Sequence, residues 1–351
     1  MAIEFNSDAL DFAVASIGPY LYAAPEQLDL LALWSAHTHR FEAFAASPRL
    51  SIRSMVPGCG KTTALNLAKL LSARGENMGH TTPASLYTLI DSEHPTLCLD
   101  EIDNLFSSTG FSRANPALQA VLNDGYTRDG TVRVMRSGVP TKLSIYGTVA
   151  FGGIGRLPAA MNSRAVPLMM TKGLPAEVFD TIIEGPIISF CSDMFNDWLS
   201  NDSAISFLRS AERRPEIAGL SDPRSRQIAA PLLAIASLAG PEWQERGMRA
   251  IRHAFLGVSE EKVLSRAQMA LRDAVAAWDS DASFMTGEQL TVRMAGLPNS
   301  VWAKVFNVES KAGIHLLASL LKSVGVSATN HRIEGKQTHS YSKDELTKAQ
   351  I

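Results

Sequence analysis

The residues of this chain best suited to chemistry lie in one loop of small and basic side chains. Gly58 and Gly60 precede Lys61, and a helical pattern starts at Thr62. Glycines let backbone amides converge on the phosphates of a nucleotide, the lysine can reach the β- and γ-phosphates, and the threonine hydroxyl can ligate Mg²⁺. The pattern usually opens with glycine, whereas this chain has Met55. The expected nucleotide contacts are Pro57, Gly58, Cys59, Gly60, Lys61, Thr62 and Thr63.

A pair of carboxylates follows a later apolar run. Thr96–Leu99 is typical of a buried strand and ends in Asp100 and Glu101. We expect Asp100 to hold Mg²⁺ together with Thr62, and Glu101 to orient and polarise the attacking water. A surface turn after a buried strand is the alternative. It does not explain why two motifs occur in this order, each at the C-terminal end of a strand. The sequence therefore predicts ATP as substrate, Mg²⁺ as cofactor and hydrolysis as the reaction.

The elements that must position these residues alternate between strands and helices up to residue 170. This alternation is typical of an α/β fold with a parallel sheet. The expected strands are Arg49–Ser54, Thr96–Leu99, Thr148–Phe151 and Ala165–Met170, and the expected helices are Thr62–Arg74 and Pro116–Leu122. Residues 8–46 have the periodicity of two or three helices, and residues 176–278 are almost purely helical.

Length and composition bound the organisation of the chain. Its 351 residues exceed the size at which a single core usually stops growing, and 46% apolar with 19% charged residues is a globular composition. No apolar run is long enough to span a membrane, no signal peptide is visible, and three scattered cysteines fit a reducing compartment. We therefore expect a cytoplasmic protein of a bacterial or phage-infected cell that has no membrane partner.

We expect four parts along the chain. They are an N-terminal helical segment (1–47), a P-loop ATPase α/β core (48–170), a helical lid (171–280) and a C-terminal domain (281–351). The net charge of the whole chain is −2, whereas residues 285–351 carry eight basic and five acidic side chains. The C-terminal part is therefore the basic end of an otherwise acidic chain.

A basic hairpin is expected just before the strand that starts at Thr148. Residues 131–136 and 141–146 alternate with a period of two around a turn that contains glycine and proline. This segment is similar to the pre-sensor hairpin of ring-shaped AAA+ motors, such as minichromosome-maintenance helicases, which pushes on the DNA backbone inside the channel. A solvated hairpin whose basic residues keep it soluble is the alternative. The resemblance implies phosphate contacts by Arg133, Arg136 and Lys142.

Two arginines occupy places that AAA+ proteins use to stabilise phosphates. Arg164 comes just before a late strand, where an arginine in AAA+ rings reaches the γ-phosphate of a neighbouring subunit. Arg224 precedes the helix Gln227–Leu238, and the resemblance implies that it reaches back to the phosphates from the lid, with Arg226 as the fallback. The alternatives are an ion pair within the subunit for Arg164, and helix capping with surface charge for Arg224.

One further AAA+ position is not matched. These proteins usually place a polar residue, most often asparagine, at the end of the strand that contains Phe151. Two glycines follow Phe151 in this chain. The water-positioning role of that residue is therefore unassigned, with Arg156 and Thr148 as the only candidates.

The C-terminal part is similar to a winged-helix module. Its helices are followed by a polar, hairpin-like segment at His331–Tyr341. We expect Ile314–Ser323 to be the recognition helix, with Arg332 and Lys336 on the wing as DNA contacts. Winged helices also serve as docking surfaces for proteins, so this alternative stays open.

Taken together, these segments resemble a family of P-loop ATPases from phages and mobile elements, often found downstream of primase modules and described as helicase-like. The resemblance covers roughly residues 8–345. It rests on segments that include Leu33–His39, Gly60–Thr62, Leu99–Asn104, Leu122–Tyr126, Ala150–Pro158, Pro231–Trp243 and Leu317–Lys322. It implies an AAA+-like core that forms a hexameric ring, acts on single-stranded DNA as a replicative helicase, and works with a primase or another replication protein.

Two other functions are consistent with the same residues. One is a helicase loader or remodeller, which uses ATP as a switch on a protein partner. The other is a nucleotide-gated regulator with little turnover, which Met55 and the unmatched polar position favour. A paired-histidine metal site at His37 and His39 is less favoured, because residues two apart do not face each other on a helix, and we expect a structural role or a base contact. Trp34 and Trp243 are expected in the core.

Overall fold

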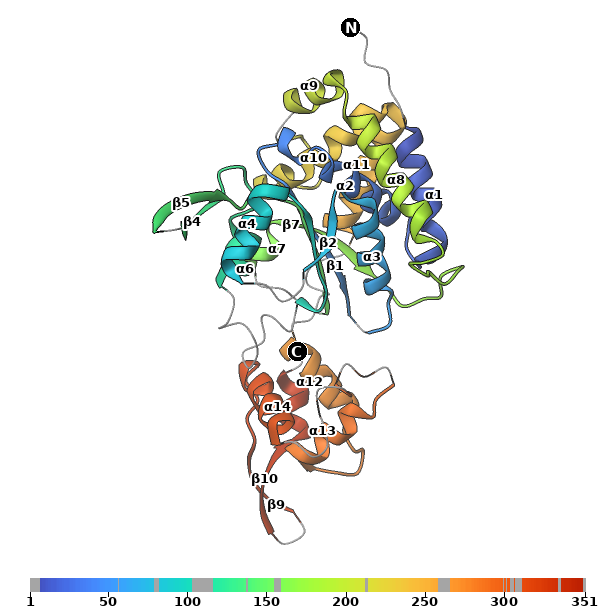
Figure 1. Cartoon of the computed structure of the whole chain (residues 1–351). Helices are drawn as coiled ribbons and strands as arrows, with labels where there is room; N and C mark the ends of the chain where they lie inside the picture. The colour runs from blue at the N-terminus through green and yellow to red at the C-terminus, as the bar shows by residue number, and fades with distance from the viewer. Residues whose placement is uncertain are drawn as a thin grey trace. The chain divides into compact units, whose positions relative to one another are not determined.

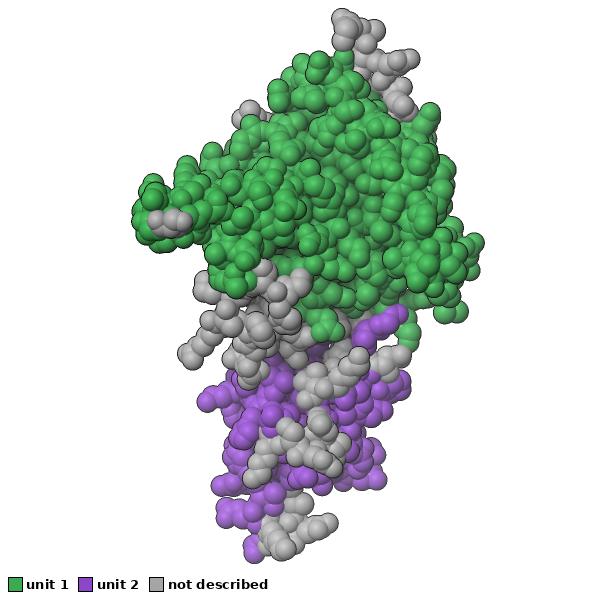
Figure 2. All heavy atoms as spheres, viewed as in Figure 1, with its two compact units in different colours: residues 1–54, 59–259 green, residues 55–58, 260–351 purple. Residues whose placement is uncertain are grey.

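The structure is a computed structural model of residues 1–351 that divides into two compact units (Figure 2). The first unit contains residues 1–54 and 59–259, and the second contains residues 55–58 and 260–351. The structure describes residues 7–55, 57–78, 82–102, 116–136, 138–154, 159–211, 214–257, 266–298, 300, 302–303, 306, 311–333 and 336–349.

The N-terminal segment of the first unit is helical, as the sequence predicts. It contains α1 (Asp8–Ile17) and α2 (Pro25–Thr38), with short 3₁₀ turns at Gly18–Tyr20 and Phe41–Ala43. The break follows from Pro19, which has no N–H to continue the helical hydrogen bonds. Trp34 and Trp243 are fully buried, which confirms their place in the core.

The two histidines of this segment make structural hydrogen bonds. His37 is fully buried, with Nδ1 at 2.8 Å from the Trp34 carbonyl and Nε2 at 3.0 Å from Ser47 Oγ. His39 Nε2 lies 3.0 Å from the Leu71 carbonyl. Burial is the main cause that lowers the pKa of each histidine to about 4, so both rings are neutral at pH 7.

Five parallel strands form the central sheet, in the order β2-β3-β6-β1-β7. Their bounds are β1 (Arg49–Ser54), β2 (Gly75–Asn77), β3 (Thr96–Leu99), β6 (Val149–Ile154) and β7 (Ala165–Met170). Because β6 lies between β1 and β3, Gly152 is level with Ile52 of β1, and Phe151 is level with Leu99 of β3. The carboxyl ends of these three strands are therefore neighbours, at the edge of a parallel sheet where ligands usually bind.

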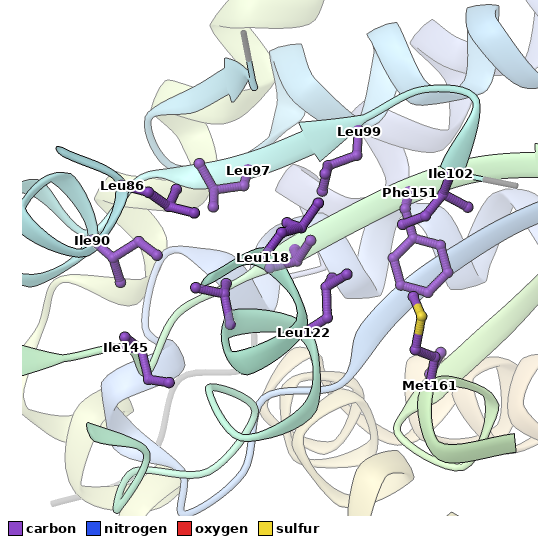
Figure 3. Close-up of a cluster of buried hydrophobic side chains, with 13 residues drawn as sticks. Leu86, Ile90, Leu97, Leu99, Ile102, Leu118, Leu122, Ile145, Phe151 and Met161 are labelled. Atoms are coloured by element: carbon purple, nitrogen blue, oxygen red, sulfur yellow. The ribbon is translucent and has the colours of Figure 1, made fainter. Parts of the chain in front are cut away.

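Helices cover both faces of this sheet (Figure 1). On one side, α3 (Lys61–Leu71) packs on β1, β3 and β6. On the other side lie α4 (Pro83–Glu93), α6 (Pro116–Asn123) and the short α7 (Ala159–Asn162). Side chains from these helices and from β3 and β6 form a buried apolar cluster around Leu99 and Phe151 (Figure 3). Burial on both faces explains why the strands are nearly continuous apolar runs.

The predicted hairpin is confirmed. It consists of β4 (Thr131–Arg136) and β5 (Val139–Ser144), which pair antiparallel apart from the main sheet. Gly138 in the turn has a φ of +80°, a left-handed conformation that favours glycine. The strand β5 contacts α4.

The remaining part of the first unit is helical. It contains α8 (Gly185–Leu199), α9 (Asp202–Ser210), α10 (Pro223–Ala239) and α11 (Pro241–Leu256). Asp222 caps α10, because its carboxylate accepts a hydrogen bond of 2.8 Å from the Ser225 amide. Both α10 and α11 pack on α2, so this helical segment shares a core with the N-terminal helices.

The second unit has its own small sheet and helices. Its elements are α12 (Arg266–Ala276), β8 (Phe284–Thr286), α13 (Gly287–Ala295), α14 (Lys311–Ser323), β9 (Thr329–Ile333), β10 (Lys336–Ser342) and α15 (Lys343–Ala349). The strands form an antiparallel sheet in the order β8-β10-β9. Trp302 is buried and donates its indole N–H to Asp273 of α12 at 2.8 Å.

The fold is thus a mixed α/β architecture with a parallel five-stranded sheet and many helices, which confirms the coarse class expected from the sequence. The four parts expected along the chain are a finer division than the two units and remain a prediction. Helix α12, which the sequence places in the lid, falls in the second unit. Among the described residues, no helix is both long and apolar enough to cross a membrane.

Candidate nucleotide-binding site

The phosphate loop has the backbone conformation that its glycines allow. Gly58 and Gly60 have φ values of +74° and +77°, in the left-handed region where an L side chain would be strained. Gly60 is the residue that precedes α3, and no side chain of the described residues caps that helix. The start of α3 is the positive end of the helix dipole, which favours an anion.

Lys61 is anchored at the carboxyl end of β1. Its ammonium donates a hydrogen bond of 2.8 Å to Ser54 Oγ, on the last residue of that strand. The positive charge of Lys61 is thus held at the edge of the sheet where the parallel strands end. Ser54 was not among the residues singled out from the sequence, although its position at the end of the strand before the loop is a usable signal.

Thr62 and Asp100 meet directly. The Thr62 hydroxyl donates a hydrogen bond of 3.0 Å to Asp100 Oδ2, and Asp100 Oδ1 accepts one of 2.8 Å from the Glu101 amide. Asp100 is exposed, and Thr62 is exposed enough to reach solvent. A hydroxyl and a carboxylate are hard oxygen donors, and Mg²⁺ commonly takes one or two such groups together with phosphate oxygens and waters. The donor set fits Mg²⁺, and the binding of this ion stays a prediction.

Glu101 lies beside this pair with an unusual backbone. Its φ is +53°, one of three positive values among the described residues other than glycine, and the residue is exposed. Such a conformation costs free energy in a residue with a side chain, and residues held this way cluster at functional sites.

Strand β6 has a glycine where a polar residue was expected to help position water, and the reason is steric. Gly152 of β6 lies so close to Asp100 that an added Cβ would be 3.1 Å from Asp100 Oδ1. A side chain at this position would force the Asp100 carboxylate to move. Of the two candidates for this role, Arg156 lies outside the described residues. Thr148 is buried and lies 2.7 Å from Thr96 Oγ1, at the opposite end of β3 and β6.

Arg164 and Arg224 are brought together, but not at the phosphate loop. The guanidinium carbons of both lie 5.2 Å from the centre of the Tyr126 ring, and Arg224 also donates to the Tyr126 hydroxyl at 2.5 Å. The Arg164 carbonyl accepts a hydrogen bond of 3.0 Å from the Arg49 amide, so Arg164 sits at the amino end of β1 and β7. The structure therefore does not bring Arg224 to Lys61. Tyr126 had no assigned role in the sequence.

The basic hairpin presents two of its three expected contacts on one face. Arg133 and Lys142 are exposed and lie directly opposite each other on β4 and β5. Arg136 lies on the other face and donates to Thr88 of α4 at 2.7 Å. Like charges in directly opposed positions destabilise a strand pair, so the Arg133–Lys142 pair is an electrostatic cost unless an anion offsets it.

The expected wing contacts lie in the second unit. Arg332 is exposed on β9, opposite Gln337 of β10. Lys336 begins β10, and its side chain lies outside what the structure describes. On α14, the expected recognition helix, the exposed residues His315, Ser319 and Lys322 recur at the spacing of one helical face.

Comparison with known proteins adds one similarity. Residues 176–350 match the model of a family described as "Protein of unknown function (DUF3631)". The matched range begins after β7, so it contains Arg224 and Arg332 but neither the phosphate loop nor Asp100. No curated protein matches the chain. The similarity thus concerns the helical segment and the second unit, and the nucleotide site is argued from its own geometry.

Proposed function

We propose that this protein is a Mg²⁺-dependent ATP hydrolase with an AAA+-like P-loop core. The observation that carries the proposal is the Thr62–Asp100 hydrogen bond of 3.0 Å beside a lysine held at the end of β1. It joins the first turn of the helix after a glycine loop to the end of a separate buried strand. Two sequence motifs that are far apart along the chain thus meet where a nucleotide triphosphate would place its phosphates.

Each residue of the proposed site has a role in binding ATP or in hydrolysing it. The α3 amides and Lys61 would hold the phosphates, and Thr62 and Asp100 would hold Mg²⁺. Bound there, Mg²⁺ supplies charge that offsets the phosphate oxygens. Glu101 would orient a water molecule and accept its proton, and this requires its exposed side chain to turn toward the γ-phosphate. Arg164 of a neighbouring subunit would add positive charge during phosphoryl transfer.

The basic hairpin supports DNA as the ligand on which the ATPase acts. Arg133 and Lys142 repel each other across β4 and β5, and a phosphate backbone between or along them would relieve this cost. Met135 and Val139 near the turn are 67% and 61% exposed, so the hairpin also offers apolar contacts next to its charges. The favoured activity is that of a replicative helicase of a phage or mobile element, acting on single-stranded DNA in the cytoplasm.

The second unit is proposed as a winged-helix-like DNA-binding module. Two helices, α13 and α14, precede the β9–β10 hairpin, and His315, Ser319 and Lys322 form a polar stripe on α14. Side chains of these types can bond to phosphates and base edges in a groove. The basic Arg332 and Lys336 on the hairpin strands would contact the backbone beside it.

An exposed apolar segment supports self-association. Leu174, Val178 and Ile182 are each about nine-tenths exposed, and Ile183, Ile187 and Phe190 continue the segment into α8. Contiguous apolar surface of this kind usually marks an interface. Helix α8 packs on α3, the helix that starts at Lys61. This segment is the surface that we propose for contact between the subunits of a ring of six.

The proposal is tested by ATP hydrolysis of the wild type and Lys61→Ala, with and without single-stranded DNA, beside sizing in ATP. We expect turnover by the wild type only, several-fold stimulation by DNA, and an ATP-dependent oligomer. An ATP turnover that does not change when nucleic acid is added would contradict the helicase function. It would favour a loader or remodeller that acts on a protein, such as a primase or another replication protein.

A nucleotide-gated regulator is the second candidate, and Gly152 favours it. No polar side chain can lie at that position without crowding Asp100, so one group that usually helps to position water is missing there. Such a protein would bind ATP, change its oligomeric state and release little phosphate.

A further inference from the structure

A small cavity lies between three segments of the first unit. It has a volume of about 190 Å³, and it is lined by residues 43–46, by the end of α9 with the residues after it, and by Gln227, Ala230 and Pro231 of α10. Five of the described lining residues are alanines, so small side chains leave the space open. Pockets for small molecules usually measure roughly 300–1,000 Å³. This cavity is smaller, and its size suits an apolar side chain of a protein segment.

One wall of the cavity is fixed by the α/β core. The Tyr146 hydroxyl lies 2.9 Å from the Phe44 carbonyl oxygen, and the Arg128 amide donates a hydrogen bond of 3.0 Å to the Ala45 carbonyl. Both bonds hold the backbone that lines the cavity. The space is therefore formed in the absence of an occupant, as in most binding pockets.

The polar groups of the lining define what the cavity can hold. Pro231 has no N–H, so the Gln227 carbonyl, four residues earlier in α10, receives no helical hydrogen bond from that position. The charged side chains among the described lining residues are Arg209 and Arg214, and both are exposed. Neither makes an ion pair among the described residues. The complementary occupant carries an apolar side chain with carboxylates beside it.

The chain itself contains a segment of this chemistry. Residues 173–184 hold three acidic and no basic residues. Val178 and Ile182 are each 87% exposed, and Glu177 is exposed next to Val178. The 173–184 segment therefore presents apolar side chains and carboxylates together, which matches the cavity in both polarity and charge.

The 173–184 segment is held in a defined conformation. The Glu177 amide donates a hydrogen bond of 2.9 Å to the Pro19 carbonyl, and the ring of Phe179 packs on the ring of Tyr20 with centroids 5.3 Å apart. Asp180 Oδ1 accepts a hydrogen bond of 2.7 Å from the next amide but one. Because the segment is already ordered, little conformational entropy is lost when it binds.

The cavity and the 173–184 segment lie at opposite ends of α8. The segment leads into this helix at Gly185, and α9, which lines the cavity, begins three residues after α8 ends at Leu199. The 15 residues of α8 span about 22 Å at roughly 1.5 Å per residue. The segment is tied to Pro19 and does not reach the cavity of its own subunit. An occupant with this sequence must come from another molecule.

We propose that the 173–184 segment of one copy of this chain docks in the cavity of a second copy. The apolar side chains of the segment enter the space, and its carboxylates face Arg209 and Arg214. The inference rests on the self-association proposed above and names the second surface of that contact. Two different surfaces meet, so the contact is head-to-tail and can close into a ring.

Cross-linking of cysteine variants tests the contact directly. Val178→Cys marks the segment and Ala45→Cys marks the exposed rim of the cavity, whereas the three native cysteines are buried. With ATP and a short bismaleimide, a mixture of the two variants should give a covalent dimer, and each variant alone should not. Val292→Cys of α13 mixed with Ala45→Cys is the matched control and should give none. A dimer of Val178→Cys with itself, or no dimer in the first mixture, would overturn the inference.

Reversal of charge provides a second test, read by sedimentation in ATP after circular dichroism has confirmed folding. Arg209→Glu with Arg214→Glu, and separately Glu177→Arg, should each raise the subunit dissociation constant at least about 10-fold, because like charges then meet. The three changes combined should restore it to within about 3-fold of the wild type, because opposite charges face each other again. Arg249→Glu with Arg252→Glu, on the exposed side of α11, is the charge-matched control and should assemble normally.

The two proposals fail in different ways. A wild type that stays monomeric in ATP would refute the self-association itself. A wild type that assembles, beside cavity variants that assemble equally well or a combined variant that does not recover, would overturn the docking of the 173–184 segment alone.

Discussion

The Thr62 hydroxyl donates a hydrogen bond of 3.0 Å to Asp100 Oδ2 and so joins the first turn of α3 to the end of β3. The two strands that lead to these residues, β1 and β3, are not adjacent, since β6 lies between them. The contact therefore passes over the end of β6, where Gly152 leaves the room for it. Strand β6 is therefore part of the site even though it supplies no functional side chain.

The first prediction concerns that glycine. Gly152→Ala places a methyl group 3.1 Å from Asp100 Oδ1, which is closer than most Cβ atoms approach another atom. The carboxylate must shift by a few tenths of an ångström, and we expect ATP turnover to fall about 10-fold, because catalytic groups are sensitive to small displacements. The free energy of unfolding should change by less than about 1 kcal/mol. Steady-state phosphate release and urea unfolding measure the two effects.

Gly147→Ala is the matched control for this substitution. Gly147 lies just before β6, and an added Cβ there would meet only Ile90 Cγ2 at an ordinary 3.6 Å. Its turnover should equal that of the wild type. Equal activity of the Gly152 and Gly147 variants would mean that the position of the Asp100 carboxylate does not limit the reaction.

The second prediction concerns the face of the hairpin that carries Arg133 and Lys142. Replacing both residues by alanine removes the two proposed phosphate contacts, and it leaves the backbone pairing of β4 with β5 in place. The slope of log K against log salt for single-stranded DNA should become shallower by about 1.4, since each contact contributes about 0.7. Fluorescence anisotropy over a range of salt concentrations measures this slope.

Arg249→Ala with Arg252→Ala provides the same change of net charge on a different surface. Both arginines are exposed on α11. This control should leave the salt slope nearly unchanged. If both double variants lowered the slope equally, binding would reflect the overall charge of the protein, and the hairpin would not be a specific contact.

The third prediction concerns the apolar segment before α8. Val178→Asp with Ile182→Asp puts two carboxylates on side chains that are each 87% exposed, so folding should be unaffected. Burying those charges in an interface would be costly, and we expect the subunit dissociation constant in ATP to rise at least about 10-fold. Sedimentation of the variant should show monomers where the wild type is assembled. Val292→Asp, on the half-exposed surface of α13, is the control and should assemble normally.

The fourth prediction concerns pH and the buried histidines. Burial lowers the pKa of His37 and His39 from 6.5 to about 4. Below pH 6.5 the unfolded chain binds protons that the folded chain does not bind, so the free energy of unfolding falls as pH falls, until the folded pKa near 4 is reached. Each histidine contributes a slope of about 1.4 kcal/mol per pH unit in this window. Urea unfolding at several pH values measures the slope.

His37→Asn should be less stable than the wild type at pH 7.5, because it loses buried hydrogen bonds. Its stability should also fall less steeply between pH 6 and 5, by about 1.4 kcal/mol per pH unit. An unchanged slope would show that His37 is protonated in the folded protein and that the ring is not kept neutral by burial.

The strands that carry the site could be predicted from the sequence because their signals are local. The alternation of Arg49–Ser54 and the apolar run Thr96–Leu99 each match a strand with the same bounds. The predicted helix after the loop was too long, since α3 ends at Leu71 and Gly75 begins a strand. The three residues of β2 have no apolar pattern, because only their backbone takes part in the sheet edge.

Contacts that depend on the packing of distant segments could not be predicted. The sequence predicts phosphate contacts for Arg164 and Arg224 but does not show that both lie on Tyr126. It also shows two glycines after Phe151 as a departure from a family pattern, whereas the structure gives the reason at Gly152. In each case the sequence does not show which ends of strands and which first turns of helices become neighbours, because this depends on the strand order.

In the proposed function, Glu101 drives hydrolysis at a site made by Lys61, Thr62 and Asp100. The most direct test is to measure ATP binding and phosphate release side by side for the wild type and Glu101→Gln. The substitution keeps the size of the side chain and removes its capacity to accept a proton from water. We expect the dissociation constant for ATP to stay within about 3-fold of the wild-type value while turnover falls at least about 100-fold. Unchanged turnover, or binding of ATP without measurable turnover in the wild type, would contradict the proposed function.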